Sequence, residues 1–309
     1  MMNSSDESGQ TLHGGLLIVG SMAIIGLTDN LIPLIAEMAG LWQFHTIRSL
    51  MSVPLIALII LARGRSLRPH NPWLLSIRSA LIAGSMILYF GSLTLMPVAA
   101  AGAGLFTAPI FVLLFSVILF RTRVGIWRVL AVTIGFVGVL LVLKPDPGNL
   151  DISVLFPLFA AVLYGLGQLM TRHHCSHEDT LVVLLMFYVA IGLGCAAGLL
   201  IFSLWPAPEE WRQAAPFFTG GWVPVTGEFI FWTSVHALGS IIAIAGLIRG
   251  YQIADPTYLG VFEFSFLLFA GVWGYVIWRH LLDPASLAGI AAIIAAGIAI
   301  TLRSRGRLP

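Results

Sequence analysis

The sequence predicts an all-α integral membrane protein of ten transmembrane helices, arranged as two inverted five-helix repeats. Three observations predict this fold: ten long hydrophobic runs, few charged residues, and a weak similarity between the two halves of the chain. Hydrophobic residues make up 58% of the chain and charged residues 10%, whereas soluble domains carry about 25% charged residues. A soluble fold could not bury this much apolar surface, so a lipid bilayer is the expected solvent.

Each hydrophobic run is long enough to cross a bilayer, which takes about 20 apolar residues in a helix. Inside hydrocarbon every backbone donor and acceptor must be satisfied within the chain, and a helix achieves this. In order along the chain, the predicted spans are residues 15–35, 37–62, 73–93, 97–120, 124–143, 152–172, 180–203, 227–248, 256–278 and 284–303.

The connections between the spans support this division. Residues 1–13 are polar and contain no Lys or Arg, so a cleaved signal peptide is not expected before the first span. Most loops are short, which predicts that consecutive spans are antiparallel neighbours. The longest connection, 205–226, is rich in proline and glycine and is expected to be an outer loop with a short helix around 209–215. Pro109 is expected to kink the fourth span, as a hinge or beside tightly packed small residues.

The basic residues predict the orientation, because Arg and Lys are retained on the cytoplasmic side. With both termini in the cytoplasm, only Lys144, Arg212 and Arg279 lie at the outer face, and Arg48 lies inside a span. All the other basic residues then lie at or near the inner face: Arg63, Arg65, Arg68, Arg78, Arg121, Arg123, Arg128, Arg172, Arg249, Arg303, Arg305 and Arg307. We therefore expect a multi-pass protein of the cell's inner (plasma) membrane with N- and C-termini cytoplasmic.

The two halves of the chain carry a weak repeat. The segments 105–143 and 261–302 both pass from a polar or proline-bearing start through a phenylalanine-rich stretch to an arginine-containing turn and a glycine-spaced helix. Five spans in each copy, an odd number, would turn the second copy upside down relative to the first. The predicted repeats are residues 14–144 and 152–303, and such a plan suits alternating access.

Three segments carry a resemblance to a known family: residues 29–49, residues 96–120 and residues 262–275. On these segments the chain resembles the EamA-type members of the drug/metabolite transporter superfamily, from about Gly14 to Arg303. The resemblance implies export, or sometimes uptake, of small organic solutes such as amino acids and other metabolites.

Two charged residues in the outer half of the membrane are the first candidates for substrate binding. Asp29 and Arg48 lie at a similar predicted depth and could form an ion pair, which would offset part of the cost of burying both charges. Either Arg48 meets a substrate carboxylate and the pair opens during the transport cycle, or the pair is a static structural bridge. His45 lies one turn before Arg48 on the same helix face and is expected to support it.

The other candidates for substrate binding lie mostly in spans of the second half of the chain. Glu263 in the ninth span has no evident basic partner and could serve proton coupling or the recognition of an amine, with neutralisation by a neighbouring helix as the structural alternative. His236 in the eighth span could relay protons, although a histidine bonded across a helix interface is more common. Tyr89, Tyr164 and Trp232 are the aromatic residues expected to face a cavity, because their polar groups need partners in hydrocarbon.

Other function classes fit the sequence less well. A phosphate-binding loop needs its lysine, and Lys144, the only lysine, is expected outside, so direct use of ATP is excluded within this chain. No cofactor, metal or nucleic acid is expected, and the histidine-rich turn 173–178 is interpreted as loop composition. The alternatives kept are a lipid-carrier flippase on the same fold and a membrane transferase using His45, His236 or Asp255. The fifth and tenth spans lack polar side chains and are expected on the outside of the bundle or at a homodimer contact.

Overall fold

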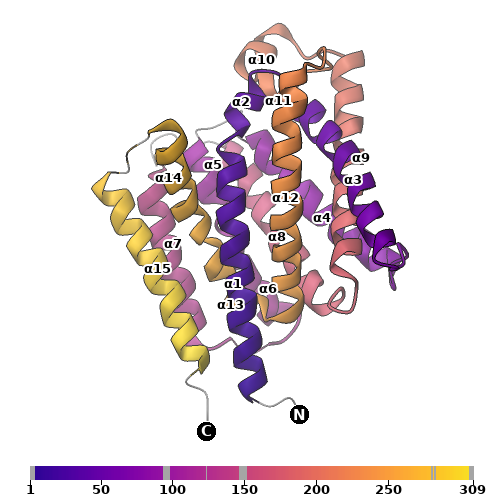
Figure 1. The fold of residues 1–309 in the computed structure, drawn as a ribbon. Coiled ribbons are helices and arrows are strands. Elements are labelled where there is room, and N and C mark those ends of the chain that lie inside the picture. Colours follow the sequence, from indigo (N-terminus) through magenta and orange to yellow (C-terminus); the bar gives the residue numbers. More distant parts are fainter. Residues whose placement is uncertain are drawn as a thin grey trace.

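The computed structural model describes residues 4–92, 98–122, 124–145, 152–279, 281 and 283–305, and these residues form helices without any strand. Figure 1 shows one bundle in which α1 begins and α15 ends at the same end, called here the terminal end. α2, α10 and α11 lie at the opposite end, called here the far end. An even number of crossings places both termini on one side, which agrees with the predicted all-α membrane fold.

The first half contains α1 (Ser4–Asp29), α2 (Ile32–Ala36), α3 (Leu41–Ala62), α4 (Pro72–Ser92), α5 (Val98–Leu105), α6 (Ala108–Ile118) and α7 (Ile126–Leu143). The second half contains the 3₁₀ helix η2 (Ile152–Val154), α8 (Leu155–His173), α9 (Thr180–Leu204), α10 (Glu209–Ala214), α11 (Pro216–Thr219), α12 (Gly227–Ile253), α13 (Pro256–Glu263), α14 (Ser265–Trp278) and α15 (Pro284–Arg305). The expected short helix around 209–215 is therefore present as α10.

Nine helical segments of the described chain are long and apolar enough to span a membrane. They are Gly9–Ala36, Leu41–Ala62, Pro72–Ser92, Ala101–Ile118, Ile126–Leu143, Leu155–His173, Thr180–Leu204, Gly227–Ile253 and Pro256–Trp278. The remaining apolar helix, α15, is apolar over Pro284–Ile300 and packs along α7, so it completes the predicted set of ten.

Three spans that the sequence predicts as continuous are each built from two helices. Pro33 and Pro109 lie in the first turns of α2 and α6, where a residue without an N–H group costs no helical hydrogen bond. At the two later breaks, the Thr107 hydroxyl donates to the Gly104 carbonyl (2.6 Å) and the Ser265 hydroxyl donates to the Phe262 carbonyl (2.7 Å). Both of these interruptions lie at mid-bundle, next to residues that line the central cavity described below.

The helices of the two halves pack reciprocally. α1 packs mainly against α12 and α14, while α8 packs mainly against α4 and α6. In two inverted repeats α1 corresponds to α8, α4 to α12, and α5–α6 to α13–α14, so each of these contacts has its counterpart in the other half. α3 packs on α9 and α7 packs on α15, each helix against its own equivalent, and Figure 1 shows the α7–α15 pair at one side of the bundle.

The α7–α15 contact depends on two glycines. A Cβ on Gly138 would lie 2.6 Å from the carbonyl oxygen of Gly289, and a Cβ on Gly289 would lie 2.6 Å from the carbonyl oxygen of Gly138. Because backbone atoms make this contact, no side-chain rotation could relieve a clash. The backbones of the two helices can approach this closely only without side chains.

We expect Gly138→Val to push α7 and α15 apart and to lower the unfolding temperature of the purified protein, since overpacking costs about 1–3 kcal/mol. Gly20→Val in α1 is the matched control, because a Cβ on Gly20 has no neighbour within 4 Å. Thermal unfolding of the two variants and the wild type measures the effect. Equal unfolding temperatures for the two variants would contradict the proposed role of the glycine contact.

One basic residue that the sequence places at or near the inner face has a buried side chain. Arg78 is 2% exposed and lies between α4 and α8, because it extends into the bundle from the second turn of α4. Arg123 and Arg307 lie outside the described residues, and the side chains of Arg303 and Arg305 are not described either. The orientation relative to the cell stays a prediction.

Candidate functional site

A cavity of about 180 Å³ lies at the centre of the bundle and is lined by residues of both halves. Its volume is below the range of roughly 300–1,000 Å³ typical of ligand pockets, so in this conformation it fits a small solute. Its wall is mainly apolar, with α1, α3–α6, α8, α9 and α12–α14 contributing and neither α7 nor α15 represented. The charged or titratable groups expected from the sequence that line it are Asp29, Arg48, Tyr89, Tyr164, His236 and Glu263.

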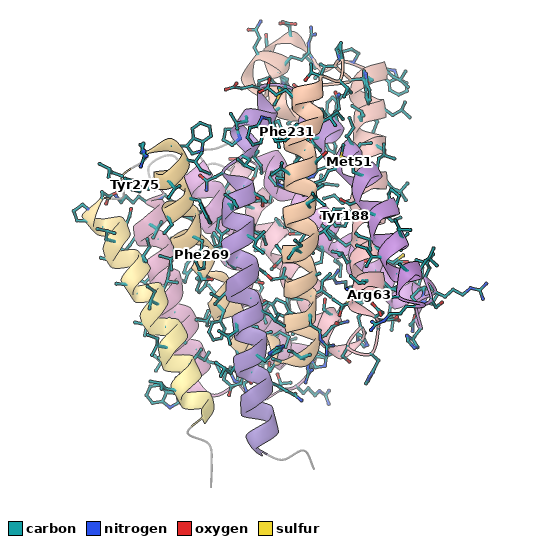
Figure 2. All side chains as sticks on the ribbon, viewed as in Figure 1. Met51, Arg63, Tyr188, Phe231, Phe269 and Tyr275 are labelled. Atoms are coloured by element: carbon teal, nitrogen blue, oxygen red, sulfur yellow. The ribbon has the colours of Figure 1, made fainter. Side chains whose placement is uncertain are left out.

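Arg48 brings a buried positive charge to the cavity. Its side chain is 6% exposed, and its guanidinium carbon lies 5.6 Å from the Phe44 ring centroid and 5.4 Å from the Tyr188 ring centroid. Figure 2 shows Tyr188 inside the bundle. The Nε atom of Arg48 has no hydrogen-bond partner, and within the described chain no carboxylate lies within salt-bridge distance of it. Two aromatic faces therefore hold the guanidinium, and its charge is left for a ligand.

The expected ion pair between Asp29 and Arg48 is absent among the described residues. Asp29 instead lies beside His236, with Oδ1 3.8 Å from Nε2. The α1–α12 contact turns the Asp29 side chain toward α12, while the two rings hold Arg48 within α3 and α9. The Asp29 side chain is 34% exposed and that of His236 is 4% exposed. Asp29 therefore lies at the exposed rim of the cavity and His236 in its interior.

His45 supports the cavity wall from behind. Its side chain is buried, it does not line the cavity, and neither ring nitrogen has a hydrogen-bond partner. The imidazole centroid lies 4.8 Å from that of Phe44 and 5.0 Å from that of Phe90. His45 thus packs between the ring that contacts Arg48 and a ring that faces the cavity, which agrees with the supporting position expected of it.

Glu263 lies at the other polar point of the cavity. Its Oε1 atom accepts hydrogen bonds from the Tyr164 hydroxyl (2.8 Å) and the Tyr251 hydroxyl (2.7 Å), and no described cation lies within salt-bridge distance. The ring of Tyr258, five residues earlier on α13, lies elsewhere, with its centroid 3.8 Å from the guanidinium carbon of Arg128. Two neutral donors hold the carboxyl without cancelling a charge on it, so it can exchange a proton or bind a cation.

The aromatic candidates divide between the cavity and the packing around it. Tyr89 and Tyr164 line the cavity, as expected. Trp232 does not, because it packs against Phe231 at 5.1 Å between ring centroids and against the cluster around Phe229. The expectation for Trp232 was wrong: at the first turns of α12 it faces helix α2 and the start of α3 rather than the bundle centre.

Sequence reasoning missed Tyr251, Ser240 and the placement of Tyr188. Tyr251 is 1% exposed and bonds to Glu263, while the Tyr188 hydroxyl and the Ser240 hydroxyl are 2.7 Å apart. Ser240 also lines the cavity. A hydroxyl at membrane depth needs a polar partner, and this is the signal that could have found Tyr251.

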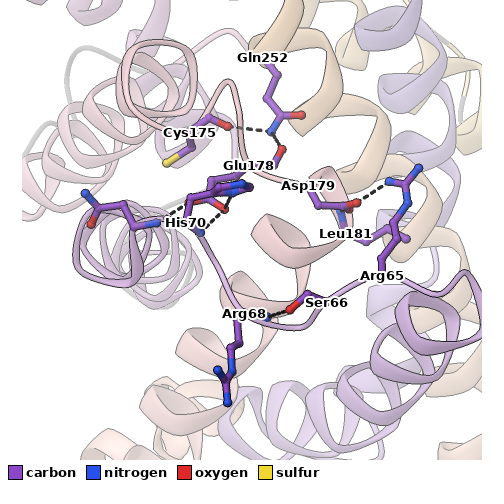
Figure 3. Close-up of polar contacts among 10 residues, drawn as sticks. Arg65, Ser66, Arg68, His70, Cys175, Glu178, Asp179, Leu181 and Gln252 are labelled. Atoms are coloured by element: carbon purple, nitrogen blue, oxygen red, sulfur yellow. Dashed lines mark hydrogen bonds and ion pairs between the residues drawn. The ribbon is translucent and has the colours of Figure 1, made fainter.

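Polar contacts around Gln252, near the end of α12, link helices at the terminal end of the bundle. Its amide nitrogen donates to the carbonyls of Cys175 (2.8 Å) and Glu178 (3.0 Å), and its Oε1 atom accepts from the Thr180 hydroxyl (2.7 Å). Its backbone carbonyl accepts from Arg172 (2.6 Å). Figure 3 shows Gln252 reaching the turn between α8 and α9. These four bonds join α12 to that turn below the cavity.

Glu178 fastens the same turn to the segment before α4. Its carboxylate accepts from the backbone N–H groups of Asn71 (2.8 Å) and His70 (2.9 Å) and lies 3.2 Å from the His70 ring nitrogen (Figure 3). Among the described residues, no group of three or more His, Cys, Asp or Glu side chains could hold a metal ion. In the histidine-rich turn 173–178, Glu178 binds backbone donors.

We expect the contribution of Glu178 to stability to disappear in acid. Burial alone would raise the pKa of Glu178, but the backbone donors of Asn71 and His70 and the His70 ring hold it below its ordinary value. A carboxyl with a lowered pKa in the folded state stabilises the fold above its unfolded pKa and loses this effect as the pH falls through the folded pKa. Glu178→Gln should therefore unfold at a lower temperature than the wild type at pH 7, with a smaller difference in acid.

Thermal unfolding between pH 7 and about pH 3, a range that extends below the ordinary glutamate pKa of about 4.3, measures this difference. Glu210→Gln is the control, because Glu210 is exposed on α10. A difference in unfolding temperature between the wild type and Glu178→Gln that is the same at every pH would argue against the lowered pKa of Glu178.

Residues 12–144 match the family model of the EamA-like transporter family. The first half of the chain therefore carries an EamA-type domain. EamA-type proteins belong to the drug/metabolite transporter superfamily, in agreement with the resemblance that the sequence carries. The domain bounds 14–144 and 152–303 stay a prediction.

Curated relatives of this chain are named as transporters. The S-adenosylmethionine uptake transporter of Rickettsia prowazekii is 23% identical over 81% of this chain and 78% of its own. The pseudopaline exporter of Pseudomonas aeruginosa is 24% identical over 84% of this chain and 85% of its own. A riboflavin transporter of Brucella anthropi is 23% identical over 86% of this chain and 87% of its own. With the family match, these names indicate a non-enzymatic, small-molecule membrane transporter.

One solved crystal structure has the same fold. It superposes on this chain with a TM-score of 0.73 and 21% sequence identity, and the match covers 97% of this chain and 98% of the other. At this identity the likeness supports the helical fold only.

Proposed function

We propose that this protein is a secondary transporter that exports small organic solutes, such as amino acids or related metabolites, by alternating access. The observation that carries the proposal is that Arg48 and Glu263, one from each half of the chain, face the same small cavity without ionic partners among the described residues. A solute carboxylate would bind at Arg48 and a solute amine, or a proton, at Glu263. The apolar wall between them would take the body of the solute.

The inverted packing of the two halves supports alternating access. The α1–α12 and α8–α4 contacts are equivalent, as are the α1–α14 and α8–α6 contacts, so the bundle has two related ways to tilt. The contacts around Gln252 link helices at the terminal end in the present conformation. At the far end, the Asp29 side chain is 34% exposed. We propose that this conformation faces the far side of the membrane.

Counterflow in liposomes tests the proposal. Purified protein would be reconstituted into vesicles loaded with an unlabelled amino acid mixture, and entry of labelled amino acids would be followed. Saturable exchange with the label recovered chemically unchanged is expected. A modified product would indicate a membrane transferase, and exchange of labelled lipid carriers with none of amino acids would indicate a flippase. Imposed gradients of opposite direction, and of pH, then test export and proton coupling.

The proposed topology places both termini in the cytoplasm of an inner-membrane protein. We expect Ser66→Cys, in the loop between α3 and α4, to react with a membrane-impermeant thiol reagent from the cytoplasmic side only. Gln213→Cys on α10 is the matched control and should react from outside only. The native cysteines, Cys175 and Cys195, are both buried, so background labelling should be low. The reverse pattern of labelling would overturn the orientation.

A further inference from the structure

A buried arginine lies between α4 and α8, outside the cavity wall. Arg78 is 2% exposed, and its Nε atom donates to the Thr171 hydroxyl at 2.8 Å. Its Nη1 atom is buried without a hydrogen-bond partner, and in the described part of the chain no carboxylate lies within salt-bridge distance of it. Arg78 is therefore a buried cation that the protein leaves without a counter-charge.

The surroundings of Arg78 hold another unpartnered polar group. Gln168 is fully buried, and neither its amide nitrogen nor its amide oxygen has a hydrogen-bond partner. Tyr164, Gln168 and Thr171 are spaced four and three residues apart, so they share one face of α8, the face that carries the bond to Arg78. An anion can be held by a guanidinium together with a neutral hydrogen-bond donor. Arg78 and Gln168 supply these two groups along the contact between α4 and α8.

This cluster lies one helical turn from the cavity, toward the terminal end. Ile82 follows Arg78 by four residues on α4, and Tyr164 precedes Gln168 by four residues on α8, and both line the cavity. Between them the helices are in close contact, because a Cβ on Gly167 would lie 2.5 Å from a methyl carbon of Ile82. The cluster is therefore sealed from the cavity only by the α4–α8 contact.

The inverted packing gives this contact an equivalent at the far end. The counterpart of α4–α8 is α12–α1, where His236 and Asp29 lie 3.8 Å apart at the exposed rim of the cavity. There Asp29 is partly exposed although α1 and α12 stay in contact, since a Cβ on Gly239 would lie 2.5 Å from a methyl carbon of Thr28. If the halves exchange conformations, the α4–α8 pair would become the one at the exposed end, and a small separation of these two helices would expose Arg78.

We propose that Arg78, Gln168 and Thr171 form a second binding site for a small anionic group, which opens toward the terminal end when α4 separates from α8. The guanidinium and the amide would bind a carboxylate or a halide through charge-assisted hydrogen bonds, which supplies the missing counter-charge. The inference rests on the alternating-access function proposed above. The anionic group is either a free anion or the carboxylate of the transported solute.

Thiol labelling in inside-out vesicles tests the site. Gln168→Cys is made in a chain whose Cys175 and Cys195 are replaced by serine, and it is treated with an anionic or a cationic methanethiosulfonate reagent. The expected result is reaction with both reagents and a rate with the anionic reagent that is higher by on the order of tenfold, owing to the charge of Arg78. Adding Arg78→Gln should remove this preference, and Arg78→Lys should keep it.

Ser66→Cys in the same background is the control, because this exposed position should show no change in reagent preference on adding Arg78→Gln. Slower labelling in chloride than in gluconate identifies a free anion as the ligand. Slower labelling on addition of the amino acids that exchange in counterflow identifies a solute carboxylate. Protection by neither would overturn the anion site.

Two other results would also overturn it. One is a Gln168→Cys variant that elutes as monodisperse, folded protein and does not react with either reagent. The other is equal rates for the two reagents with and without Arg78→Gln. Counterflow on the wild type is measured separately, so an absence of exchange would reject the proposed function, while labelling still reports whether α4 and α8 open around a positive charge.

Discussion

Arg48→Ala is expected to abolish solute counterflow while leaving folded protein in the membrane. The guanidinium is the buried cation of the cavity and has aromatic rings as its neighbours, so the substitution removes the group that would bind the solute carboxylate. A charge-assisted hydrogen bond contributes about 1.5–3 kcal/mol, which corresponds to roughly 10- to 100-fold weaker binding for one such bond. Two hydrogen bonds from the planar guanidinium to the solute carboxylate would make the loss of binding affinity larger.

Folding should survive this change. Alanine removes a buried charge whose Nε atom has no partner, which offsets the lost contacts with Phe44 and Tyr188. Arg63→Ala is the matched control: it makes the same substitution at the end of the same helix, where Arg63 is exposed at the periphery of the bundle (Figure 2). Arg48→Lys keeps the charge without the planar fork and should retain part of the exchange. Normal counterflow by Arg48→Ala would reject the role of Arg48 in binding.

Glu263→Gln is expected to give counterflow that no longer depends on pH. The carboxyl of Glu263 is buried, faces the cavity and binds two tyrosine hydroxyls, so uptake or release of its proton would change the charge of the cavity. Glutamine has nearly the same shape, keeps an acceptor for Tyr164 and Tyr251, and cannot titrate. The fold should therefore be retained while the titration is lost.

Counterflow rates of wild type and variant over a pH series measure this effect. Glu228→Gln, at the exposed start of α12, is the control and should keep the wild-type pH profile. A pH-sensitive dye inside the vesicles should also record proton movement with the wild type and none with Glu263→Gln. An unchanged pH profile in Glu263→Gln would place proton coupling at another group.

Six of the eight candidate residues chosen from the sequence line the cavity. They were chosen because burying a polar group in hydrocarbon costs free energy. Charged, imidazole and phenol groups are expensive in hydrocarbon, so their presence in a span predicts an interior position, as for Arg48 and Glu263. The same reasoning failed to choose between a cavity and a packed interface. His45 is buried and Trp232 is partly buried, both beside aromatic rings and neither lining the cavity.

Which polar groups meet could not be read from depth along the chain. Asp29 and Arg48 lie at a similar depth, but rotation of each helix about its axis decides whether two side chains face each other. Asp29 thus lies beside His236, in the other half of the sequence, and Glu263 binds Tyr164, which lies 99 residues earlier in the chain. Arg78 shows the same limit, because its position near a span end indicates its depth but not the rotation that buries its side chain between α4 and α8.

The sequence by itself determined that this chain is a bundle of membrane-spanning helices. Long apolar runs leave the backbone no other way to satisfy its hydrogen bonds in lipid, and this local constraint needs no knowledge of neighbouring helices. Only the tertiary structure decided how the spans break at mid-bundle, which faces turn inward and which charges remain unpaired around the cavity. Those features depend on side-chain packing between helices far apart in the chain, and packing of this kind leaves no periodic pattern in the sequence.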